Sequence, residues 1–543
     1  MKLDKVLLFM LGGALITTSC NDLDEAEPKG NPLTKAQNLA TNEVIPSRVD
    51  ATFAGLFNYL GNPCIASPSK LRPDDCGAVS AAISNDAEGA DFAFADNGYN
   101  WYSSADALST RNANYANPYQ RYVTPYRQIG IANQIIASFG ADVSDPHSIN
   151  EIAQARAIRA FDYMQLAPYF QFGYASSADK PCVPILKTGV DFSNNPRATV
   201  KEVYDSILVD LDYAINHLTK DRASKQYVNI NVAYGLRARA NLAMGNWAAA
   251  AADAEEAMKG YTPASIKEVS VPGFDDINAG NWIWGVDITP DKITGNKNYA
   301  APASWLSAFT GDGYSPATGN VPVINKLLYD KIPSTDVRKG WWLDEKKHSP
   351  NWAKLTWNGA KGDEIADLVI EDVKEPMAPY SNIKFGEVGG VGDNQNLSDF
   401  PLMRVEEMIL IEAEGLLKSG NEAKAKKVLE DFVRTYRDPN YSASASGRNL
   451  ADEIWFQRRV ELWGEGFFTS DAKRLGKPIV RFHGDKTTNF AANFTFNIEA
   501  TDGWLNMRFP QDEKDNNLGI VDNEGGKQPV PNQNPSLRDG VTD

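Results

Sequence analysis

Ala238-Arg-Ala-Asn-Leu-Ala-Met-Gly-Asn246 is echoed without a gap by Ala413-Glu-Gly-Leu-Leu-Lys-Ser-Gly-Asn421. Small residues in both copies allow two helices to approach closely, and Gly-Asn is typical of the turn between them. After the first copy, Ala250, Ala254 and Ala257 recur at helical spacing and share one helix face. The pattern favours tetratricopeptide-like helix pairs stacked as an α-solenoid. An unrelated alanine-rich helical hairpin would show the same pattern.

Helical periodicity continues on both sides of the first copy and after the second. A long apolar stripe runs from Val200 to Leu218, and Thr199 with Glu202 forms a capping box at its start. Shorter stripes cover residues 132–139 and 425–433. The sequence therefore predicts a mostly α protein with an irregular tetratricopeptide-like helical scaffold.

Proline and glycine become frequent in residues 266–400, where the helical stripes fade apart from a short one near residues 323–329. We interpret this segment as a loop-rich insertion that divides the scaffold, and loops on a rigid frame commonly carry binding surfaces. The predicted organisation is a signal peptide at 1–19, a flexible tether at 20–45, a first helical block at 46–265, the loop-rich aromatic insertion at 266–400, a second helical block at 401–478 and an irregular C-terminal region at 479–543.

The first twenty residues have the pattern of a bacterial lipoprotein signal. An apolar run from Val6 to Ile16 follows Lys2 and Lys5, and small polar residues then lead to Cys20. We expect Cys20 to be lipidated and to anchor the chain in a membrane through several acyl chains. Plain secretion, with Cys20 near a frayed end, is the alternative. No later stretch reaches about 18 apolar residues, so no other membrane span is predicted.

Charge and motif content exclude several classes of function. The chain carries 54 Lys and Arg against 70 Asp and Glu, a net charge of −16, which would repel a nucleic-acid backbone. Only four histidines are present, and neither zinc-ligand spacing nor a calcium-binding D-x-D-x-D-G loop occurs. Nucleophile elbows and phosphate-binding or dinucleotide-binding glycine motifs are also missing. We expect no catalytic residues, no metal and no cofactor, although a pair of carboxylates for glycoside hydrolysis cannot be identified from spacing alone.

Three cysteines remain after Cys20, in a compartment that permits disulfides. Cys64 and Cys76 could close a small loop and leave Cys182 free. Buried free thiols are an equally good interpretation of the odd number.

Aromatic residues gather in two places. Seven of the twelve tryptophans lie within residues 282–357, and a second group begins at Asn97-Gly-Tyr-Asn-Trp-Tyr102. Sugars are bound by laying a C–H face on an aromatic ring while amides bond the hydroxyls, so these groups are candidate glycan contacts. The candidate ligand-binding residues are Trp101, Trp305 and Tyr314, which have polar, Gly/Ser/Asn-rich neighbours, together with Asn100, Tyr102 and Trp282. Trp282 alternates with Trp284 in a strand-like stretch that could equally be core.

Arg458, Glu461 and Glu465 lie along one face of a predicted helix near the second echo. An acid–base pair could look catalytic at this spacing. Spacings of three and four residues more commonly mark ion pairs that tie a helix to its neighbour, and we favour that interpretation.

Several motifs together resemble the SusD/RagB family. They are Cys20-Asn-Asp-Leu-Asp24, Gln154-Ala-Arg-Ala-Ile-Arg-Ala-Phe-Asp-Tyr163, Pro401-Leu-Met-Arg-Val-Glu-Glu-Met-Ile-Leu-Ile-Glu-Ala-Glu414 and Gln457-Arg-Arg-Val-Glu-Leu-Trp-Gly-Glu-Gly466. The resemblance implies a surface-exposed outer-membrane lipoprotein that captures a glycan and acts as the lid of a SusC-like TonB-dependent transporter. It also implies binding without cleavage. A peptide ligand, a surface glycoside hydrolase and a passive assembly scaffold are the alternatives.

Overall fold

The structure is a computed structural model, and it describes residues 35–95, 101–187, 191–295 and 297–543. The mostly α prediction is confirmed. The predicted signal peptide, Cys20 and Asn100 lie outside the described residues. None of the helices in the described part is both long and apolar enough to cross a membrane.

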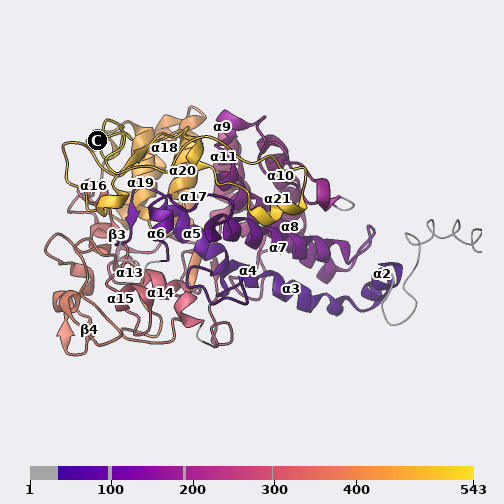
Figure 1. Cartoon of the computed structure of the whole chain (residues 1–543), viewed down its shortest axis with the longest axis horizontal. Coiled ribbons are helices and arrows are strands. Elements are labelled where there is room, and N and C mark those ends of the chain that lie inside the picture. Colours follow the sequence, from indigo (N-terminus) through magenta and orange to yellow (C-terminus); the bar gives the residue numbers. More distant parts are fainter. Residues whose placement is uncertain (1–34, 96–100, 188–190, 296) are drawn as a thin grey trace, which may run out of the picture.

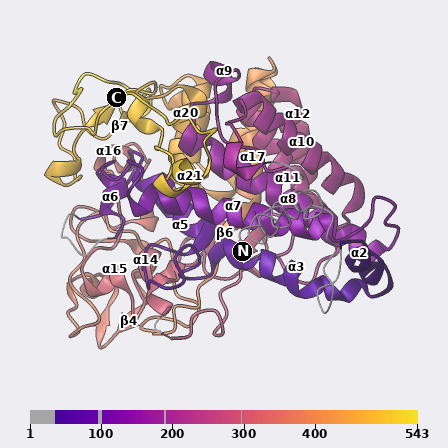
Figure 2. The same ribbon diagram turned by 45° about the vertical axis from the view of Figure 1, so that its right-hand side comes forward.

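Eight helices form a scaffold in which each helix packs on the next (Figures 1 and 2). The packing order runs from α7 to α8, α10, α11, α12, α17 and α18, and α19 also packs on α17. The helices are α7 (Ala116–Ala137), α8 (Pro146–Phe170), α10 (Val200–His217), α11 (Ile230–Met244), α12 (Trp247–Met258), α17 (Val405–Lys418), α18 (Glu422–Tyr436) and α19 (Leu450–Glu461).

The echoed sequences form two helix hairpins that are direct neighbours in space. The first copy ends α11 and turns into α12, and the second ends α17 and turns into α18. Gly245 and Gly420 adopt left-handed backbone angles of φ +82° and +89°, which explains glycine at both turns. Helices α12 and α17 pack against each other, so the two distant copies form one continuous stack. The predicted helix pairs are confirmed.

Close helix approach depends on a small residue at the α12–α17 contact. A Cβ atom built on Gly415 would lie 2.6 Å from the carbonyl oxygen of Trp247 and 3.1 Å from the Cβ atom of Ala251. The predicted capping box is also present, since Thr199 Oγ1 accepts from the Glu202 backbone N–H and the Glu202 side chain accepts from that of Thr199. Local sequence therefore sets both the ends and the spacing of these helices.

Short helices surround the scaffold. They are α2 (Lys35–Val44), α3 (Asp50–Leu56), α4 (Asn58–Gly61), α5 (Gly77–Ala87), α6 (Ser103–Asp106), α9 (Tyr174–Ser177), α13 (Ile266–Val269), α14 (Pro302–Leu306), α15 (Tyr314–Ala317), α16 (Lys326–Tyr329), α20 (Phe468–Leu475) and α21 (Gln511–Asn516). Short 3-10 turns cover Pro46–Arg48, Phe192–Asn194, Asn298–Ala300, Val337–Trp341, Pro350–Trp352, Gly362–Asp367, Ala443–Ala445, Ala492–Phe494 and Gly503–Leu505.

The strands of the described residues form four antiparallel pairs. The pairs are β1 (Phe92–Ala93) with β3 (Val323–Ile324), β2 (Trp282–Val286) with β6 (Phe400–Arg404), β4 (Thr356–Trp357) with β5 (Ala360–Lys361), and β7 (Ile479–Val480) with β8 (Asn497–Ile498). Trp282 lies opposite Arg404 and Val286 opposite Phe400. Strands β2 and β6 therefore tie together the two ends of the segment between them.

The segment between β2 and β6 occupies the lower left of Figure 1 and has a small core of its own. Trp352, Trp357, Phe309 and Ile383 belong to this core. All seven tryptophans of residues 282–357 are buried, with at most 6% of each side chain exposed. The expectation that this concentration of tryptophan marks a ligand surface is therefore corrected. Irregular chain without long helices uses large rings to fill its interior.

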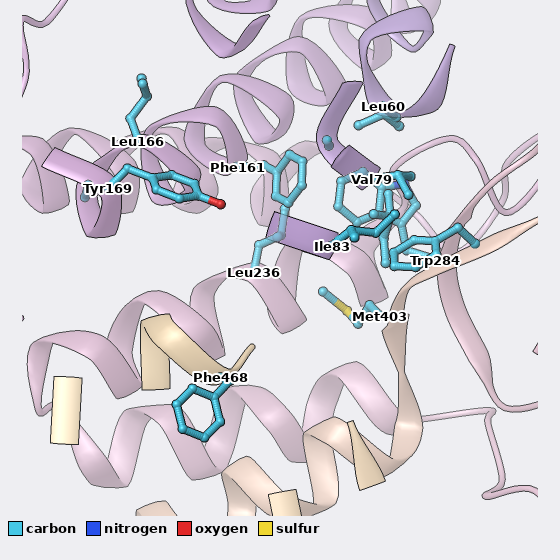
Figure 3. Packing of buried hydrophobic residues seen from close by; sticks show 14 of the residues in the cluster. Leu60, Val79, Ile83, Phe161, Leu166, Tyr169, Leu236, Trp284, Met403 and Phe468 are labelled. Carbon is cyan, nitrogen blue, oxygen red and sulfur yellow. The ribbon is translucent and has the colours of Figure 1, made fainter. Parts of the chain in front are cut away.

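The main core lies where the scaffold meets the strands. Figure 3 shows Phe161 of α8 and Leu236 of α11 beside Val79 and Ile83 of α5, with Trp284 of β2 close by. The Phe161 and Trp284 rings meet edge to face at 4.8 Å. One apolar cluster thus joins the first helical block to the strand that opens the loop-rich segment.

A buried ion-pair network fastens α19 to its neighbours. Glu461 is fully buried and accepts hydrogen bonds from Arg338, Arg404 and Arg437 at 2.8 to 3.2 Å. On the same helix, Arg458 pairs with Asp471 at 2.9 Å. The ion-pair interpretation of this helix face is confirmed.

The three described cysteines Cys64, Cys76 and Cys182 are free and buried. The free-thiol interpretation holds, and the alternative disulfide between Cys64 and Cys76 is not formed.

Candidate functional site

An aromatic cluster assembles from three segments that are distant in the sequence. Trp305 of α14 lies at its centre, with the Tyr314 ring of α15 stacked on it at 4.9 Å and an interplanar angle of 6°. Tyr102, at the start of α6, meets Trp305 edge to face at 5.0 Å, and Phe94 does so at 6.2 Å. Together with Arg72, Trp101 and Tyr299, described below, these rings form what we call the Trp305 cluster.

Hydrogen bonds fix the position of Trp305. Its indole Nε1 donates to the carbonyl oxygen of Pro73 at 2.8 Å, and its own carbonyl accepts from the Ser315 hydroxyl at 2.6 Å. Pro302 begins α14, where a missing backbone N–H is tolerated. The ring therefore joins the loop of residues 62–76 to α14 and α15.

Trp101 is the most exposed ring of the cluster, with 38% of its surface open to solvent. The guanidinium of Arg72 lies over this ring, 5.1 Å from its centre, in a cation–π contact. Asp74 in turn accepts two hydrogen bonds from Arg72, at 3.0 and 2.8 Å. The Asp74 carboxylate holds the Arg72 guanidinium in place, and the guanidinium stacks on Trp101. This contact limits the movement of the Trp101 ring.

Two half-buried tyrosines, Tyr314 and Tyr299, continue the cluster from Trp305. Tyr299 meets Tyr314 edge to face at 5.8 Å. Next to them, the Asn298 amide donates to the Asp312 carboxylate at 2.5 Å, and Asn396 donates to the Asp312 carbonyl at 2.6 Å. Asp312 is exposed and Asn298 is half-buried, so polar groups able to bond hydroxyls lie beside the rings.

The loop that carries Arg72 is braced from within. Asp75 accepts hydrogen bonds from the backbone N–H groups of Ala66 and Ser67 at 3.0 and 2.9 Å. Burial raises the pKa of Asp75, and these two bonds oppose the rise. Asp74 is thus engaged by Arg72 and Asp75 by the backbone, so both carboxyl groups brace the loop.

The structure brings together four of the sequence-predicted residues and separates one. Trp101 and Tyr314 are partly exposed, whereas Trp305 and Tyr102 are buried, at 0% and 2% exposure. The expectation that polar neighbours leave Trp305 uncovered is wrong, because rings from other segments cover it. Trp282 is 1% exposed in β2, opposite Arg404, and packs against Gly285 away from the cluster.

Sequence reasoning missed Arg72 and Tyr299. Tyr299 follows Gly-Asn-Lys-Asn, so the criterion that selected Trp101 would also have found it. Arg72 has no such signal, because its role comes from the spatial position of a Pro-rich loop.

A separate cavity of about 190 Å³ lies inside the scaffold, between α5, α8, α11, α17 and α20. Phe161, Met164, Tyr204 and Ile411 are among its apolar lining residues. Its charged groups bond one another: Arg239 pairs with Glu407 and Arg458 with Asp471. A ligand rich in hydroxyl groups would find few free partners there, so the Trp305 cluster is the better candidate site.

Known protein families match most of this chain. A family model described as "Starch-binding associating with outer membrane" matches residues 77–242, and the model of the SusD family matches residues 288–536. The second range includes Tyr299, Trp305 and Tyr314, and the first includes Trp101.

Similar proteins cover nearly the whole fold. SusD-like protein P2 of Formosa agariphila is 24% identical over 399 residues, which are 68% of this chain and 74% of the relative. A SusD-like carbohydrate-binding protein from Bacteroides vulgatus is 22% identical and has a TM-score of 0.67, covering 88% of this chain and 97% of its own. A laminarin-binding SusD-like protein is 18% identical with a TM-score of 0.59, covering 88% and 99%. These structures share the fold of this chain.

Proposed function

Because the chain belongs to the SusD family, we propose that it captures a glycan at the cell surface through the Trp305 cluster. Family members are carbohydrate-binding proteins associated with the outer membrane. The observation that carries the proposal is Trp101, a partly exposed tryptophan ring that Arg72 covers in a cation–π contact. The loop of Arg72 is in turn bonded to Trp305 through Pro73.

The division of roles within the cluster follows from exposure. Trp101 offers a face to the C–H surface of a sugar, and the exposed edges of Tyr299 and Tyr314 extend that surface. Buried Trp305 supports Tyr314 by stacking, and Tyr102 packs against Trp305. Asn298 and Asp312 bond hydroxyls at the edge, and Asn100, which precedes Trp101, is the remaining candidate.

A neutral glycan fits the charges better than an anionic one. Arg72 is a cation of the cluster, and Asp74 already accepts two hydrogen bonds from it. The net charge of −16 also disfavours polyanions. We therefore propose a neutral oligosaccharide, and we propose that it leaves uncleaved, because the SusD family consists of binding proteins.

Delivery completes the proposed function. The chain would be anchored in the outer membrane through lipidated Cys20 and would close, as a lid, over a SusC-like TonB-dependent transporter that receives the glycan. Co-purification of a barrel protein of this class with the membrane-anchored chain tests this step. A chain that is released without detergent and never captures a barrel would contradict it.

Titration calorimetry with maltoheptaose and with laminarin oligosaccharides tests the binding step. We expect saturable binding of at least one of them, and loss of that binding in Trp101→Ala. Phe192→Ala is the matched control, since Phe192 is an aromatic residue 64% exposed at a distant 3-10 turn. Equal loss in both variants, or none in either, would remove Trp101 from the site.

A peptide-binding protein and a glycoside hydrolase, the two alternative functions, would give different results. Binding of a peptide panel without binding of any glycan would favour the peptide-binding function. Appearance of shorter sugars during incubation with a bound oligosaccharide would establish a hydrolase and overturn the proposal of binding without cleavage.

A further inference from the structure

Three possible metal ligands meet where the N-terminal helices join the scaffold. Asp50 begins α3, while His147 and Glu151 lie one turn apart near the start of α8. His147 Nε2 is 2.9 Å from Asp50 Oδ1 and 3.7 Å from Glu151 Oε1. Within the described ranges, this is the one group of three or more His, Cys, Asp or Glu side chains whose ligand atoms all lie within 4.8 Å of one another.

Glu151 is the unusual member of the group. Its side chain is 2% exposed, and neither carboxylate oxygen has a hydrogen-bond partner. A buried carboxylate without a donor is unfavourable unless a cation lies beside it. Asp145 lies nearby but is also an acid, so it provides no positive charge for Glu151. Its side chain caps α8 by accepting a hydrogen bond from the Ser148 backbone N–H.

We propose that Asp50, His147 and Glu151 bind a divalent first-row transition metal ion, with Zn²⁺ the preferred member of the class. One imidazole nitrogen and two carboxylate oxygens form a ligand set that zinc accepts. Tetrahedral zinc with bonds of about 2.1 Å separates its ligand atoms by about 3.4 Å. The observed 2.9 and 3.7 Å lie on either side of that value, and all three ligand atoms lie within 4.8 Å of one another.

The surroundings suit a bound ion. Asp50 and His147 are exposed and Glu151 is buried, so the ion would enter from solvent and water would complete its coordination. Two carboxylates with a neutral imidazole carry two negative charges, which the metal balances. The ion would also fasten α3, which follows the predicted tether, to α8 of the scaffold (Figure 1).

The direct competitor of the metal is a proton. A hydrogen bond to Asp50 raises the pKa of His147, and a protonated His147 would pair with both carboxylates. The experiment must therefore measure the metal itself rather than a dependence on pH.

Titration of Zn²⁺ into the chelator-treated full chain, produced without a polyhistidine tag, tests the proposal at pH 7.5. We expect one saturable site and a rise in the thermal midpoint on adding Zn²⁺. His147→Ala and Glu151→Gln should weaken zinc binding at least about tenfold and abolish the thermal shift. Calcium should not substitute, because it prefers oxygen ligands.

His348→Ala is the matched control. His348 lies 2.5 Å from Asp363, and both side chains are exposed, but no third His, Cys, Asp or Glu among the described residues completes a group there. This variant should bind zinc as the unchanged chain does. Equal zinc affinity in Glu151→Gln and the unchanged chain, loss of binding in His348→Ala, or binding of Ca²⁺ in place of Zn²⁺ would each overturn the proposal. Unfolding measured with chelator present confirms that each variant is folded.

Discussion

The Nε1 atom of Trp305 donates a 2.8 Å hydrogen bond to the carbonyl oxygen of Pro73, and this bond links a fully buried ring to the loop that presents Arg72. The ring and the loop come from positions more than two hundred residues apart in the chain. Trp305 therefore acts on the candidate site by positioning the groups at its surface, whereas Trp101 is available for contact.

Trp305→Phe should separate these two roles. The smaller ring keeps aromatic packing but leaves the Pro73 carbonyl without its donor, so we expect the free energy of unfolding to fall by about 1–3 kcal/mol. Trp101→Ala should change it by less than about 1 kcal/mol while removing glycan binding. Urea unfolding and calorimetry on both variants measure the difference. Unchanged stability in Trp305→Phe would mean that the hydrogen bond does not hold the loop.

Glu461→Gln should destabilise the protein by about 3–5 kcal/mol at pH 7, because three buried guanidinium groups lose their shared carboxylate. Glu256→Gln, which alters a surface pair with Lys259, should change stability by less than about 1 kcal/mol. Urea unfolding of both variants gives the two values.

Acid should reduce the effect of Glu461→Gln. Burial alone would raise the pKa of Glu461, but the surrounding arginines, Arg437 foremost, outweigh burial and hold it well below the ordinary value. The folded-state pKa is depressed, so the stabilisation is present at neutral pH and is lost as pH falls below the ordinary glutamate pKa of about 4.3. The difference between Glu461→Gln and the unchanged chain should therefore shrink in this acid range. A difference that is independent of pH would contradict the assignment.

Asp162→Asn should have the opposite pH dependence. Asp162 is fully buried in α8, neither of its oxygens has a hydrogen-bond partner, and burial raises its pKa well above the ordinary value. Because its pKa is higher in the folded chain than in the unfolded chain, Asp162 lowers stability once the pH exceeds the ordinary aspartate pKa of about 3.9. Asp162→Asn should be more stable than the unchanged chain at neutral pH, and its advantage should shrink as the pH falls towards the ordinary aspartate pKa of about 3.9. Exposed Asp179 provides the control through Asp179→Asn, which should show no such slope.

Local patterns predicted the helical part of the fold well. Three local features were predicted, and the structure contains all of them: the Gly-Asn echo, the capping box at Thr199 and the ion-paired face around Glu461. Each is determined by a few neighbouring residues. These features depend on helix geometry, which sequence spacing determines directly.

The candidate site was only partly predictable, because its burial depends on segments far apart in the sequence. Gly and Ser neighbours of Trp305 suggested exposure, yet Phe94, Tyr102 and Tyr314 cover it from elsewhere. Arg72 acquires its role only when its loop lies over Trp101. Composition selected four rings that the structure brings together, but it could not say which of them are buried and which are exposed.

Because the two echoed hairpins stack closely, replacing glycine by alanine should lower stability at Gly415 and raise it at Gly130. Gly415→Ala places a Cβ atom 2.6 Å from the Trp247 carbonyl of α12, so the helices must move apart, and stability should fall by about 1–3 kcal/mol. Gly130 lies in α7 with no atom within 4 Å of the added Cβ position. Gly130→Ala should therefore raise stability by about 0.5–1 kcal/mol through helix propensity alone. Urea unfolding distinguishes the two, and a gain in Gly415→Ala would show that close contact between α12 and α17 is not required for the stack.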